Sequence, residues 1–142
     1  MTRYSYFFSV AFVLLLMSQL FMAYRTAQIE SPLYEVIKSF EKFEIRNYNS
    51  MVLAQTQMNS NLYKESSSMG FKTVANYIFG GNKENQKIAM TSPVIMEIGE
   101  ISKMSFVMPK EHSFDNLPKP NSENVELIQV QPKTYAVLAF TG

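Results

Sequence analysis

The sequence predicts an α+β domain in which one amphipathic helix packs across a mostly antiparallel sheet. Segments in which apolar and polar residues alternate lie before and after residues 62–79, where apolar residues instead recur with helical spacing. About 115 residues follow a hydrophobic amino-terminal run. That length is enough for one small domain with a single core and too short for two.

Short strands are expected at residues 34–40, 42–48 and 51–58, the last two separated by turn-forming residues at 47–50. In the second strand Phe43 and Ile45 alternate with Glu44 and Arg46, as in a half-buried strand. Further extended segments are expected from residue 86 onward, with Pro93 indicating an edge or a bulge, and at 101–108, 125–130 and 134–140. The last segment is apolar on both faces, so it is expected to need cover on both.

The helix is expected from about residue 62 to residue 79. Residues 59–61 offer capping side chains to its amino end, and the two glycines and asparagine at 80–82 accept the positive φ angles that end helices. Its apolar residues follow the i, i+3, i+4, i+7 spacing: Phe71, Val74, Ala75 and Ile78. Covering the sheet is the ordinary role of such a face.

Residues 1–28 form a hydrophobic leader. Its apolar run at 6–24 approaches the ~20 residues that span a bilayer as a helix, and Arg3 precedes it. Cleavage after Ala23 or Ala27 would place Phe21 or Arg25 where a small residue is needed. We therefore expect an uncleaved membrane anchor, as a transmembrane helix, with the domain outside the cytoplasm, in a periplasm or lumen. A buried core helix is the alternative.

Composition excludes several classes of function. The chain has no cysteine, which rules out disulfides, thiolate metal sites and covalent c-type haem attachment. Removing Arg3 and Arg25 from the 13 basic residues leaves 11, against 12 acidic residues, in the domain. This balance is not that of a nucleic-acid-binding protein.

One motif stands out, Lys87-Ile88-Ala89-Met90-Thr91-Ser92-Pro93-Val94, which follows the helical segment 70–82. Together with residues 34–36, 43–48, 106–109, 117–120 and 139–142, in that order, it resembles the shared core of the SOUL haem-binding family over residues 32–142. The resemblance implies a pseudo-twofold fold, a distorted antiparallel barrel or curved sheet carrying helices. The second unit is expected to be incomplete here. Residues 134–140 would then stay uncovered unless a partner chain or homodimer completes the barrel.

The resemblance also implies non-enzymatic, non-covalent binding of haem or a related tetrapyrrole in an apolar cleft beside the helix. The corresponding positions are Ser68, Phe71, Ala75 and Asn76, and Lys72 is a further candidate binding residue. Phe71 and Ala75 keep the apolar character, whereas Ser68 and Asn76 are neutral. The propionates of a porphyrin would therefore need Lys64, Lys72 or Arg46.

His112, the only histidine, is the candidate iron ligand, and a solvent-exposed loop residue without a role is the alternative. Asn47 stands where some family members have a histidine, so ligation there does not carry over. The alternative function is a small-molecule or protein-interaction module that does not bind haem. An enzyme is not favoured, because the sequence shows no paired acid and base.

Overall fold

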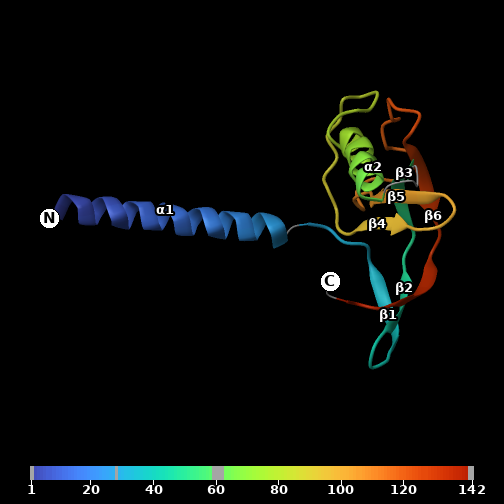
Figure 1. Ribbon diagram of the computed structural model, residues 1–142, viewed down its shortest axis with the longest axis horizontal. Helices are drawn as coiled ribbons and strands as arrows, with labels where there is room; N and C mark the ends of the chain where they lie inside the picture. The colour runs from blue at the N-terminus through green and yellow to red at the C-terminus, as the bar shows by residue number, and fades with distance from the viewer. Residues whose placement is uncertain (1, 28, 59–62, 141–142) are drawn as a thin grey trace.

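The computed structural model describes residues 2–27, 29–58 and 63–140 (Figure 1). In chain order the elements are α1 (Thr2–Ala27), β1 (Tyr34–Ser39), β2 (Glu44–Tyr48), β3 (Met51–Met58), α2 (Tyr63–Ile78), β4 (Val94–Glu97), β5 (Ser102–Val107), β6 (Glu126–Val130) and β7 (Lys133–Val137). The α+β class is confirmed. The predicted capping residues 59–61 lie outside the described residues.

Two antiparallel sheets make up the domain, with strand orders β1-β2-β7 and β4-β5-β3-β6. One long antiparallel ladder runs through both sheets. β2 continues into β3 along the chain, and their pairing partners, β7 for β2 and β6 for β3, are also consecutive in the chain. Tyr48 pairs with Lys133 and Met51 with Val130, so the register is the same on both sides of the junction. Pro132 lies in this junction and has no N–H to donate. The sheets are thus two parts of one bent ribbon, and the strands described do not close into a barrel.

The core lies between α2 and the four-stranded sheet, where α2 packs on β3 and β5 (Figure 1). Val74 and Ile78 are fully buried, as the helical spacing predicts, against Ala54, Met104 and Phe106. Phe71, on the same predicted face, is 40% exposed. By helical spacing Phe71 lies between Val74 and Ala75 around the axis, so the spacing does not account for its exposure.

Gly80 and Asn82 end α2 in different ways. Gly80 adopts the expected positive φ, 109°. Asn82 is buried, and its side-chain amide donates to the carbonyl oxygens of Tyr77 (3.1 Å) and Gln86 (2.7 Å). The side-chain oxygen of Asn82, Oδ1, accepts a hydrogen bond from the Gln86 N–H at 2.9 Å. Asn82 therefore acts through its side chain, which fixes the path of the chain after the helix.

The extended strand expected from residue 86 is wrong before Val94. Residues 86–93 pair with no strand. Separate hydrogen bonds hold them in place: the Ile88 N–H donates to the Ile78 carbonyl (2.8 Å), and the Thr91 hydroxyl donates to the Val107 carbonyl (2.6 Å). Ile88 is buried whereas Met90 is 41% exposed, so burial does not follow the alternation of the sequence in this segment. β4, directly after Pro93, is an edge strand, as the proline predicts.

The three-stranded sheet lacks cover among the described elements. β7 ends at Val137, three residues before the predicted end, and no described helix or strand packs on this sheet's faces. Leu138 is 60% exposed and Phe140 86%. The cover that the apolar sequence predicts for this segment is thus not supplied within the described part of the chain.

α1 extends away from the domain in Figure 1 and packs against no other described element. Among the residues described, no helix combines the length and the apolar character needed to cross a membrane. The membrane-spanning helix expected at residues 6–24 is therefore not supported by the structure.

Candidate functional site

The five α2 positions that the sequence singled out lie along one flank of the helix. Successive residues are about 100° apart, which orders them around the axis as Phe71, Ala75, Ser68, Lys72 and Asn76. Ser68, Lys72 and Asn76 are exposed, whereas Ala75 is only 7% exposed and belongs to the core. Phe71 lies between the buried Val74 and Ala75 around the axis, yet its side chain is 40% exposed. Around the helix axis, the flank is therefore apolar on the side of Phe71 and Ala75, and polar and cationic on the side of Ser68, Lys72 and Asn76.

Phe71 continues this flank onto the sheet. Its ring centroid is 5.2 Å from that of Phe106, which is buried in β5. Phe106 pairs with Val94 of β4, so their side chains lie on the same face of the sheet. Val94 is 37% exposed. We call Phe71, Phe106 and Val94 the apolar strip; it presents accessible surface at both ends of a buried aromatic ring.

A glycine allows α2 to approach the sheet closely enough to form this strip. A Cβ placed on Gly70 would lie 3.1 Å from Cγ of Met58 and 3.5 Å from Cβ of Met104. The absent side chain brings the helix down onto β3 and β5. Phe71, the next residue, is thereby held over Phe106.

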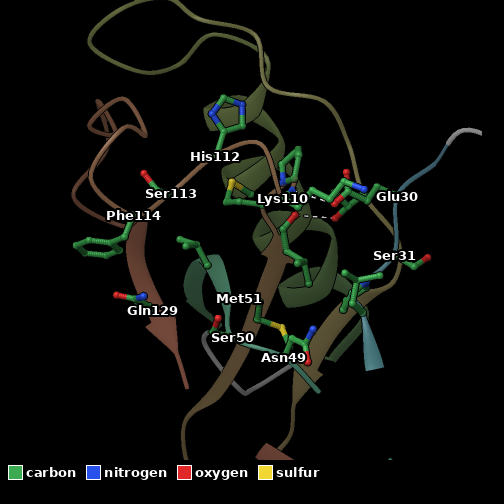
Figure 2. A pocket seen from close by; sticks show the side chains of 17 residues that line it. Glu30, Ser31, Asn49, Ser50, Met51, Lys110, His112, Ser113, Phe114 and Gln129 are labelled. Atoms are coloured by element: carbon green, nitrogen blue, oxygen red, sulfur yellow. Dashed lines mark hydrogen bonds between the residues drawn. The ribbon is translucent and has the colours of Figure 1, made fainter. Parts of the chain in front are cut away.

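His112 lies elsewhere, in a cavity of about 360 Å³ that we call the bend pocket (Figure 2). The pocket is located where the two sheets meet, and its lining includes Glu30, Met51, Lys110, His112, Phe114 and Gln129. No residue of α2 lines it. Figure 2 shows the imidazole at the end of the pocket farthest from Ser50 and Asn49. The structure thus separates His112 from the other predicted binding residues.

The His112 side chain is 12% exposed. The alternative prediction, that His112 is a solvent-exposed loop residue, is therefore wrong. Its Nε2 atom is 3.7 Å from Oε1 of Glu111, a carboxylate that is itself largely exposed. Across the described residues, no cluster of three or more histidine, aspartate or glutamate side chains could hold a metal ion.

Comparison with known proteins decides the family. The family model described as SOUL heme-binding protein matches residues 29–142. The chain belongs to the SOUL family. It is 30% identical over 108 residues to human "Heme-binding protein 2". The match covers 70% of this chain and 52% of the relative, so this SOUL chain spans about half the length of the curated relative it matches.

Asn47, at the position where some SOUL proteins have histidine, is used structurally in this SOUL chain. It lies in β2 of the three-stranded sheet, and its side-chain oxygen accepts a hydrogen bond from the Thr134 hydroxyl at 3.2 Å. This interaction links β2 to β7. Asn47 lies neither in the apolar strip nor in the bend pocket.

Among the side chains that the structure describes, Lys72 is the one of the three basic residues considered for propionates that lies on the α2 flank. Arg46 lies on the three-stranded sheet, 2.8 Å from the Glu44 carboxylate and 4.4 Å from the Tyr34 ring centroid. Hydrogen bonds to Tyr48 and then to Glu44 raise the pKa of Arg46. The side chain of Lys64 lies outside the described residues. Lys72 is therefore the cation that the described side chains offer beside the apolar strip.

Sequence reasoning missed Val94 and Phe106 of the strip and most of the bend pocket. Val94 and Phe106 meet only through strand pairing, and their sequence separation leaves no local signal. The pocket is assembled from five segments far apart in the chain, around residues 30, 50, 91, 110 and 129. Strand register could have brought Val94 to Phe106, whereas the bend that forms the pocket has no periodic pattern.

Proposed function

We propose that this SOUL chain binds haem or a related tetrapyrrole non-covalently on the α2 flank, without catalysing a reaction. Membership of the family and the similarity to a protein named for haem binding support this function. The observation that carries the placement is Phe71, 40% exposed and packed against Phe106 with the two rings tilted, and with the cationic Lys72 next to it in sequence.

The residues present fit the chemistry of such a group. A porphyrin offers flat apolar faces and acidic propionates. Phe71 and Val94 would contact a face, and Lys72 would attract a propionate, with Ser68 and Asn76 as hydrogen-bonding neighbours. The flank offers no histidine, because the chain's only one lies in the bend pocket. Binding would thus depend on apolar contact and charge, and not on a strong axial ligand.

Hemin titration of the purified full chain, followed by its Soret absorption, tests the proposal. Phe71→Asp places an unpaired charge on the apolar strip and should weaken binding at least about tenfold, because a buried charge beside an apolar ligand is costly. Met69→Asp is the matched control, since Met69 is exposed on the same helix and lines a different cavity. Ala75 is less suitable for a charged substitution, because its burial would make the change a test of folding.

His112→Ala is the second variant in this titration. Because His112 lies outside the α2 flank, the Soret band and the hemin affinity should stay nearly unchanged. Loss of binding in His112→Ala, with Phe71→Asp tolerated, would instead indicate a histidine-ligated haem in the bend pocket.

The uncovered three-stranded sheet favours a second candidate function, as an interaction module. Tyr135, Leu138 and Phe140 expose apolar surface at its β7 side. Large exposed apolar areas commonly mark contact surfaces. A partner chain or a second copy that completes the barrel would bury them. Sedimentation velocity over a range of concentrations tests self-association, and a chain that is monomeric and shows no spectral change with hemin would point to a different partner.

We further propose a location outside the cytoplasm, attached to a membrane through residues 1–28. The support is the apolar run at 6–24 preceded by Arg3. Fractionation with protease protection tests it. A mature terminus at residue 24 or 28 would contradict the uncleaved anchor, and digestion from the cytoplasmic side would reverse the orientation.

A further inference from the structure

The bend pocket has no part in the haem-binding proposal, yet it is a built cavity. Three hydrogen bonds attach the segment before β1 to its margin: Lys110 N–H to the Glu30 carboxylate (2.9 Å), Ser92 N–H to the Glu30 carbonyl (2.8 Å) and Asn49 N–H to the Leu33 carbonyl (3.1 Å). These bonds join three loops that are distant in sequence. The volume of about 360 Å³ is within the range of small-molecule sites.

The charges of the lining cancel. Glu30 and Lys110 are its two formally charged residues, counting histidine as neutral, and Figure 2 shows them on the same side of the pocket. One Glu30 oxygen accepts the Lys110 backbone N–H. The Lys110 ammonium forms no ion pair with any carboxylate of the described residues. A ligand with net charge of either sign would therefore meet one repelling group as well as one attracting group.

The remaining lining combines an apolar wall with uncommitted polar groups. Met51, Val107 and Phe114 contribute apolar side chains. Ser50 and Gln129 line the pocket, and their side chains have no hydrogen-bond partner within the described parts of the chain. Such groups can bind the polar head of a ligand whose apolar body lies on the wall.

We propose that the bend pocket is a second binding site, for a small amphipathic molecule without net charge. Its apolar or aromatic body packs on Met51, Val107 and Phe114, and its hydrogen-bonding head lies near Ser50, Gln129 and the Glu30–Lys110 pair. This site is separate from the α2 flank and does not depend on haem binding.

Three probes of one shape test the charge preference: 3-phenylpropanamide, 3-phenylpropanoate and 3-phenylpropylamine. Their affinities for the full chain are compared by ligand-observed NMR titration at pH 8. The neutral amide should bind about fivefold more tightly than either charged probe, the size expected of one partly exposed charge. Tighter binding of a charged probe, or no saturable binding of the amide, would overturn the proposal.

Two nearly isosteric variants sharpen the test. Glu30→Gln keeps an oxygen for the Lys110 N–H and leaves Lys110 as the only charge, so preference should move to the carboxylate. Lys110→Met leaves Glu30, and preference should move to the amine. Unchanged preference in both variants would contradict the assignment of these two charges to the site.

A blocking variant locates the binding. Ser50→Trp fills the pocket from an exposed bend residue and should abolish binding of all three probes. Ser39→Trp, at an exposed strand position outside the lining, is the matched control and should bind as the parent chain does. Circular dichroism verifies that both variants fold. Probe binding that survives in folded Ser50→Trp would place it elsewhere and refute the proposal.

Discussion

Among the aromatic side chains of α2 that the structure describes, Tyr77 is the most buried, at 1% exposure, and its hydroxyl donates to the Pro118 carbonyl at 2.9 Å. This bond attaches the proline-containing loop to the helix. Burial, and after it the negative charge of Glu84, raises the pKa of Tyr77 to about 12 from an ordinary value of 10.0. The apolar spacing of the sequence did not predict that Tyr77 is buried. A tyrosine beside the apolar stripe can be buried only if its hydroxyl has a hydrogen-bond partner, and the sequence does not show that partner.

The raised pKa predicts an alkaline loss of stability. The unfolded chain releases the Tyr77 proton near pH 10.0, whereas the folded chain keeps it until about pH 12. The stabilisation is therefore complete below pH 10 and is lost as the pH rises toward 12. Urea unfolding at a series of pH values should show this decline, and Tyr77→Phe should show a smaller one. An equal decline in both proteins would contradict the role of Tyr77.

At neutral pH, Tyr77→Phe should cost about 1–2 kcal/mol in the free energy of unfolding, because the Pro118 carbonyl loses its donor in a buried place. Tyr135→Phe is the matched control, since Tyr135 is 43% exposed and should change stability by less than about 0.5 kcal/mol. A neutral effect at Tyr77 would mean that water replaces its hydroxyl.

Two residues of the predicted stripe should differ in their contributions. Ile78 is fully buried, so Ile78→Ala should cost about 2–5 kcal/mol. Phe71 is partly exposed, and Phe71→Ala should cost less than Ile78→Ala while weakening hemin binding. Urea unfolding measures both. A larger loss of stability at Phe71 than at Ile78 would show that the flank is closed to a ligand.

At the scale of elements, the sequence pattern predicted the helix, whose contacts are local, but not the segments that are held by contacts distant in sequence. The helix, expected at 62–79 and found at Tyr63–Ile78, depends on its own spacing and on Gly80. Residues 86–93 alternate like a strand but are fixed by single hydrogen bonds to Ile78 and Val107, which no local pattern reveals. The α2 positions of the candidate site came from family resemblance, whereas their partners on the sheet required the pairing of β4 with β5.

The end of α2 depends on a close approach at Gly81. A Cβ there would lie 2.6 Å from the Asn76 carbonyl oxygen, which already accepts the Gly81 N–H at 2.8 Å. Gly81→Ala must displace backbone and should cost about 1–3 kcal/mol. Gly99→Ala, where a Cβ would meet nothing within 4 Å, is the control and should be close to neutral. Equal unfolding midpoints in urea for these two variants would contradict this account of the helix end.

At the scale of the whole molecule, the bent ribbon divides the surface into regions with different chemistry. The four-stranded sheet carries α2 and the apolar strip, the bend holds the pocket with His112, and the three-stranded sheet exposes apolar side chains. The sequence could place apolar residues in strands. It could not show which of these regions stays open, because that depends on how one ladder bends between Tyr48 and Met51.

The most direct test of haem binding on the α2 flank is paramagnetic broadening of assigned amide resonances when hemin is added to the full chain. High-spin ferric iron broadens the signals of nearby nuclei, so the account predicts loss of the Phe71, Lys72 and Val94 amides first, with Ser50 and Gln129 retained. Diamagnetic zinc protoporphyrin, which should shift the same amides without that broadening, is the control. Broadening centred on His112, Ser50 and Gln129 would contradict the account.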